Sequence, residues 1–74
     1  MVHERIRQEP EIMTGKPVIA GARITVELLL RRLGHGDTLD DLLSDFPGLT
    51  PADVRAAQVF AADTLAGLRQ IAAE

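Results

Sequence analysis

The residues that could support catalysis or metal binding are few and poorly spaced for either role. The two histidines, His3 and His35, have no cysteine partner, no HExxH motif and no carboxylates at metal-ligand spacing. The only serine, Ser44, lacks a Gly-x-Ser-x-Gly elbow, so no nucleophile with a base and an orienting group can be assembled. We therefore expect no enzyme activity, no metal, no cofactor and no small-molecule ligand. We place His3 at a mobile terminus and His35 beside the last carbonyls of a helix.

A group of aspartates between residues 37 and 45 is better explained by helix capping than by magnesium binding. Asp41 stands three residues after Thr38, which is the position of a capping-box acid, and Asp40 falls on the solvent face of the same predicted helix. The glycines beside Lys16 and His35 lack the sequence context of a phosphate-binding loop or a dinucleotide site. These residues predict a solvated acidic face with no nucleotide site.

Basic side chains offer a different chemistry, which is contact with an anionic partner. Residues 1–32 carry six cations and four anions, whereas residues 33–74 carry two cations and seven anions. As a recognition helix, the third predicted helix would aim Arg55 and Gln58 at bases, although Asp53 beside them would repel phosphate. A plain three-helix core without DNA contact explains the same pattern, so both interpretations stay open. The candidate DNA-binding residues are Lys16, Arg23, Arg31, Arg32, Arg55 and Gln58.

The first region that must position these residues, 1–24, is rich in glycine, proline and β-branched residues and predicts an extended β-ribbon. Its alternation of apolar and polar residues is poor and Gly21 interrupts it, so it needs a further strand. Either a second copy of the chain or residues 4–12 would supply that strand.

From Thr25 onward, apolar residues recur at the spacing of one helix face, and a capping threonine precedes each of three such segments. As an alternative to a longer third helix, Gly67 would mark a bend or fraying that ends it early. The fold class is therefore mainly α, with a short N-terminal β-ribbon followed by a three-helix homeodomain-like (helix-turn-helix) bundle. The predicted helices cover residues 25–34, 38–46 and 50–70.

Size and composition indicate one small domain that gains stability from association. The chain has 74 residues, 46% of them hydrophobic, and no cysteine, which excludes a disulfide framework and fits a cytoplasmic protein. We find no signal peptide and no membrane span in it. The third predicted helix carries a second apolar stripe, so we expect a homodimer. The candidate interface residues are Val18, Ile19, Arg23, Phe60, Leu65, Leu68 and Ile71.

Three blocks in this order, GKPVIAGARITV over 15–26, GDTLDDLL over 36–43 and FPGLTPADV over 46–54, resemble domain of unknown function 433. The resemblance covers roughly residues 5–65. It implies a small bacterial or archaeal protein with a short β region and a homeodomain-like fold, and several such proteins resemble VapB-type antitoxins paired with PIN-like ribonuclease toxins. Where the family usually has threonine this chain has Ala22, which removes any contact that a hydroxyl would make. Arg23 matches the family pattern, and we expect it to act across a dimer or against carboxylates of a toxin.

Two functional hypotheses follow from the residues and the resemblance together. In the first, the chain is an antitoxin of a type II toxin–antitoxin system that neutralises a PIN-like ribonuclease and binds operator DNA as an autorepressor. In the second, it is a homodimeric protein-interaction module without a nucleic-acid role. Steep loss of binding with added salt would favour the first, because DNA contacts release counterions whereas apolar pairing does not.

Overall fold

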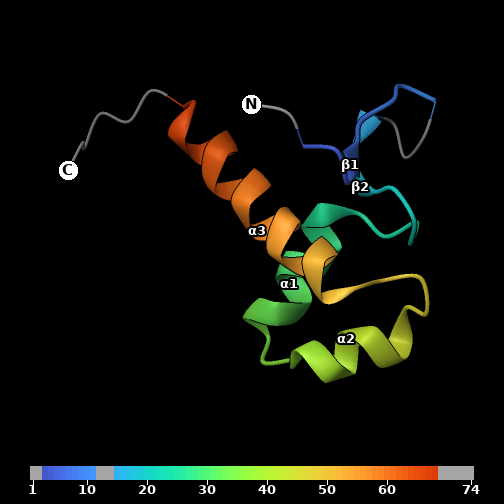
Figure 1. Cartoon of the computed structure of the whole chain (residues 1–74). Coiled ribbons are helices and arrows are strands. Elements are labelled where there is room, and N and C mark those ends of the chain that lie inside the picture. The colour runs from blue at the N-terminus through green and yellow to red at the C-terminus, as the bar shows by residue number, and fades with distance from the viewer. Residues whose placement is uncertain (1–2, 12–14, 69–74) are drawn as a thin grey trace.

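Three helices follow a short β-hairpin in the computed structural model, which describes residues 3–11 and 15–68 (Figure 1). The mainly helical fold class with an N-terminal ribbon is thereby confirmed. The elements in chain order are β1 (Ile6–Arg7), β2 (Val18–Ile19), α1 (Val26–Gly34), α2 (Leu39–Asp45) and α3 (Pro51–Ala66).

The hairpin is completed by the chain itself. β1 and β2 are antiparallel, with Ile6 opposite Ile19 and Arg7 opposite Val18. On the other side of β2, Val18 forms a bridge with Thr25, and the Val26 amide donates to the Pro17 carbonyl at 2.9 Å. Of the two predicted sources of a further strand, it is therefore the segment within residues 4–12 that pairs with β2.

Each helix begins at the threonine that the sequence indicates. The Thr25 hydroxyl accepts from the Leu28 amide at 3.0 Å, and both Thr38 with Asp41 and Thr50 with Asp53 form reciprocal capping boxes. These contacts satisfy amides that a helix N-terminus leaves without intrahelical partners. At the end of α1, the backbone amide of His35, not its ring, donates to the Arg31 and Arg32 carbonyls.

The prediction that the third helix continues to residue 70 is wrong, because α3 ends at Ala66 and Gly67 caps it. The Gly67 amide still donates to the Asp63 and Thr64 carbonyls, so it closes the last turn. Glycine has a low helix propensity, and the residues around it are exposed, so no packing compensates.

The core lies where α3 crosses α1 and α2, with β2 and the segment after it forming one side (Figure 1). Leu29 of α1 and Leu42 of α2 are completely buried, and Ala57 of α3 meets them without exposed surface. The C-terminal half of α3 extends away from the other two helices (Figure 1). Within the described part of the chain, no helix is long and apolar enough to cross a membrane.

Candidate functional site

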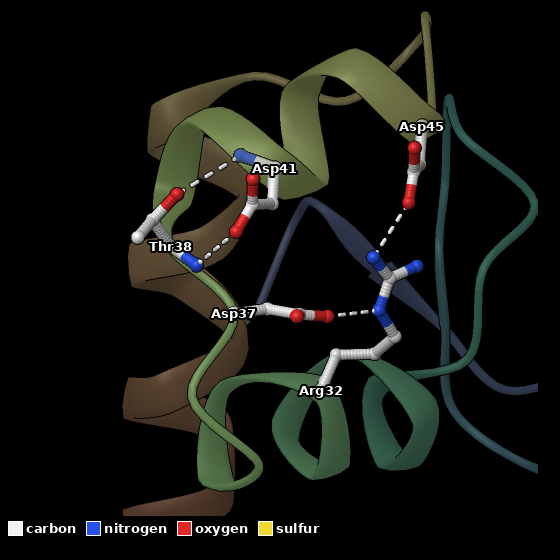
Figure 2. A network of polar contacts seen from close by, with 5 residues as sticks. All are labelled: Arg32, Asp37, Thr38, Asp41 and Asp45. Atoms are coloured by element: carbon white, nitrogen blue, oxygen red, sulfur yellow. Dashed lines mark hydrogen bonds and ion pairs between the residues drawn. The ribbon is translucent and has the colours of Figure 1, made fainter.

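Arg32 links α1 to the start and the end of α2 (Figure 2). Its Nε donates to an Asp37 carboxylate oxygen, and its Nη2 lies 2.5 Å from Asp45 Oδ2. The guanidinium also lies over the Phe46 ring, 5.5 Å from the centroid. The hydrogen bonds to Asp37 and then Asp45 raise the pKa of Arg32. Arg32 therefore joins two helices, and its pairing with two carboxylates makes it less available to phosphate than the sequence suggested.

Lys16 and Arg31 share one carboxylate, that of Glu27 on α1. Lys16 Nζ lies 3.3 Å from Glu27 Oε1, and Arg31 Nη2 lies 3.3 Å from Oε2. These hydrogen bonds, the Lys16 one foremost, lower the pKa of Glu27. Because Glu27 offsets part of their charge at the same surface, Lys16 and Arg31 are weaker phosphate contacts than the sequence suggested.

Asp53, expected to repel phosphate, is instead buried and paired. Its side chain is only 8% exposed, its Oδ2 accepts from the Thr50 amide, and its Oδ1 accepts from Arg5 Nη1 at 3.1 Å. The sequence showed Asp53 as a capping acid, but its arginine partner, Arg5, directly precedes β1 and lies 48 residues earlier in the chain. Asp53 thus ties the hairpin to α3, and the base-reading face loses the anion that had counted against it.

Arg23, Arg55 and Gln58 remain exposed as predicted. Arg55 and Gln58 lie on the solvent side of α3, early in the helix that follows the α2–α3 turn. Among the described residues, no carboxylate contacts either Arg23 or Arg55. Of the cations in the described part of the chain, these two arginines are the ones left open to a partner.

The N-terminal segment is held against α3 by a contact that the sequence did not reveal. His3 Nε2 lies 3.0 Å from Asp63 Oδ2, and the His3 ring meets Phe60 edge-on with centroids 5.1 Å apart. Asp63 Oδ2 is itself buried and has no hydrogen-bond partner among the described residues, so His3 approaches it closely without forming a hydrogen bond. His3 therefore lies against α3, and Phe60, half-buried against the core and this ring, is not an open interface residue.

The predicted apolar interface is only partly accessible. Val18 and Ile19 are buried in the chain's own core, because β1 and residues 24–26 flank them, so their interface assignment is wrong. Leu65 and Leu68 are 59% and 55% exposed, and Ile71 lies outside the described residues. Sequence reasoning missed Leu28, Leu39 and Val59, which are also exposed large apolar side chains.

Of the acidic residues between 37 and 45, the three drawn in Figure 2 do not all face one point. Asp37 and Asp45 face Arg32, whereas Asp41 turns back to the Thr38 amide, whose hydrogen bond lowers the Asp41 pKa. In residues 3–11 and 15–68, no three potential metal ligands come together.

Comparison with known proteins places these features in a family. The family model described as a protein of unknown function (DUF433) matches residues 6–61. An uncharacterized protein, y4eO, of Sinorhizobium fredii is 29% identical over 69 residues, which is 92% of this chain and 31% of that protein. A DUF433 member protein from Anabaena variabilis, solved by crystallography, has 30% sequence identity and a TM-score of 0.75, with 80% of this chain and 58% of that chain covered. This chain accordingly spans about a third of the first relative and somewhat more than half of the second. With its hairpin, its three capped helices and most of its length matched, the chain belongs to the DUF433 family.

Proposed function

We propose that the chain is an antitoxin-like binding protein of a type II toxin–antitoxin system, which acts as a homodimer and neutralises a PIN-like ribonuclease. The exposed apolar surface on the second half of α3, formed by Val59, Ala62, Leu65 and Ala66, with Leu68 just beyond, supports the association that this role requires. A small domain that exposes large apolar side chains together gains stability when another protein covers them. The role proposed is binding, without catalysis.

The second copy of the chain is the partner proposed for this part of α3. Asp63, four residues after Val59, borders the exposed apolar surface with a side chain that is 40% exposed, and no other acidic residue of α3 is exposed. Two copies can therefore pair through the apolar side chains of this surface, with one carboxylate per copy at its border. The toxin would then bind elsewhere on the dimer.

Co-expression of a tagged chain with the product of the neighbouring gene tests the antitoxin role. We expect the tagged chain to capture that product and to relieve its toxicity in growing cells. Loss of that relief when the chain is omitted is the control. A harmless neighbour that is not captured would contradict the antitoxin role and leave the homodimeric interaction module as the proposal.

Autorepression through operator DNA is a second candidate, supported by the exposed Arg55 and Gln58 on α3 after the α2–α3 turn. Arginine can bond guanine and glutamine can bond adenine in the major groove. We expect Arg55→Ala to weaken binding to a duplex carrying the upstream sequence of the gene more than binding to a random duplex. Equal and weak binding of both duplexes at low salt would contradict the repressor role.

A further inference from the structure

Arg23 lies in a tight turn that is fixed at its base. The turn runs from Ile19 to Ile24, two residues that are almost completely buried. The Ile19 amide donates to the Ile24 carbonyl at 2.8 Å, and the Ile19 carbonyl accepts from the amides of Ala22 and Arg23 at 3.3 Å. The backbone of the turn is therefore closed on itself above two core side chains.

The same turn is supported from the side by the loop between α2 and α3. A Cβ atom on Gly48 would lie 2.6 Å from the Gly21 carbonyl oxygen, so the two backbones are in direct contact. A side chain at position 48 would push them apart. The Arg23 turn is thus held by the hairpin on one side and by the helix-turn-helix loop on the other, and its geometry is set before any partner arrives.

Arg23 itself has an uncommon backbone conformation for its residue type. Its φ is +57°, and within the described residues it is the one non-glycine with a positive φ. Left-handed backbone is disfavoured for residues with a Cβ, and strained positions of this kind concentrate at functional sites. Glycine would adopt the conformation without strain, so the turn alone does not require arginine.

The charge of Arg23 is also uncompensated, unlike that of most cations around it. Five of the seven described lysine and arginine side chains contact a carboxylate, namely Arg5, Arg7, Lys16, Arg31 and Arg32. Arg23 is exposed and has no such contact. A rigid turn therefore presents an unpaired guanidinium to the outside.

We propose that the Arg23 turn is a recognition site for a carboxylate on an acidic segment of a partner protein. A guanidinium matches a carboxylate in a planar two-bond geometry, and a fixed backbone lowers the entropy lost on binding. A nucleic acid fits less well, because it needs several free cations on one surface, whereas Lys16, Arg31 and Arg32 are engaged with Glu27, Asp37 and Asp45. The site does not require the partner to be a toxin, so it stands apart from the proposed function.

Titration of the full-length chain with a hexaglutamate peptide, followed by amide chemical shifts, tests this site. We expect shifts centred on residues 20–24 and on the adjoining loop at residues 47–49. Arg23→Gly, which suits the left-handed backbone and so keeps the fold, should weaken peptide binding by about tenfold or more. Arg23→Lys should recover only part of that lost affinity, because lysine keeps the charge but cannot donate two parallel hydrogen bonds to one carboxylate.

Arg7→Ala is the matched control, because Arg7 is an exposed arginine of the same domain whose charge already meets Glu9. It should leave hexaglutamate binding unchanged. Equal losses in the Arg7 and Arg23 variants would overturn the proposal, since binding would then depend on charge alone. Shifts in the Arg23 turn with a random-sequence DNA duplex but not with hexaglutamate would overturn it in favour of a nucleic-acid site.

Discussion

At the scale of single residues, the partner of each basic side chain decides what that side chain can do. Arg32 and Arg5 have spatial partners, Asp45 and Asp53, that bring different elements together. Arg23 and Arg55 have no carboxylate partner among the described residues and stay available for another molecule. The same residue type therefore serves structure at some positions and recognition at others, and only the three-dimensional arrangement tells them apart.

Replacement of Arg23 by glycine should stabilise the fold even though it removes a charged group. The positive φ costs roughly 1–2 kcal/mol for a residue with a Cβ, and the greater freedom of glycine in the unfolded chain offsets part of the gain. We expect Arg23→Gly to raise the free energy of unfolding by about 0.5–1 kcal/mol, measured by thermal and urea unfolding. Ala22→Gly is the control, because Ala22 has no positive φ, and it should not stabilise. A similar rise in both variants would contradict the strain argument.

Protonation of Asp41 should remove a stabilising cap of α2. Its pKa is lowered from 3.8 chiefly by the hydrogen bond from the Thr38 amide, so the charged form favours the folded state. The contribution is complete at pH values above 3.8 and is lost as the pH falls through the lower folded-state pKa. We expect Asp41→Asn to lower the unfolding temperature at neutral pH and to match the natural chain at strongly acidic pH. Asp40→Asn, on the same turn but outside the capping box, is the control and should lower the unfolding temperature less at neutral pH.

At the scale of elements, local signals were readable from the sequence and distant pairings were not. Thr25, Thr38 and Thr50 are confirmed as N-caps, because capping depends on residues at most three positions apart. The predicted ribbon is also confirmed, but Val18 and Ile19 were assigned to an interface because nothing local shows which strand pairs with them. The His3–Asp63 and Arg5–Asp53 contacts join segments 60 and 48 positions apart, so spacing rules cannot reveal them.

The junction between the hairpin and the helix-turn-helix loop should be intolerant of a side chain at position 48. A Cβ there would lie 2.6 Å from backbone oxygen, which cannot rotate away as a side chain would. We expect Gly48→Ala to lower the free energy of unfolding by about 1–3 kcal/mol, the range for overpacking. Gly34→Ala is the control, since a Cβ at this last residue of α1 would meet nothing within 4 Å. Equal unfolding free energies for the two variants would show that the loop can move away from Gly21.

At the scale of the whole molecule, the buried face of α3 and its exposed apolar surface lie in opposite halves of the helix. The first half of α3 supplies Asp53, Val54 and Ala57 to the buried interior, whereas the second half ends in exposed apolar residues beyond the other helices (Figure 1). The relatives extend well past the length that this chain covers, so their additional segments are outside the comparison. Association through the exposed end of α3 can therefore be tested by substitutions within this chain.

A charge introduced at Leu65 should separate the proposed dimer without unfolding the protomer. Leu65 is 59% exposed in the single chain, so an aspartate there stays hydrated in the monomer but would be buried against the partner's α3 in a dimer. We expect Leu65→Asp to reduce the mass measured by sedimentation equilibrium to that of one chain while the helical circular dichroism is kept. Leu28→Asp places the same change at another exposed leucine, on α1, and should preserve the dimer mass. Pairing through α3 would be ruled out if the natural chain sediments as a monomer, or if Leu65→Asp does not change the mass of the dimer. The apolar end of α3 would then be proposed to bind a different protein.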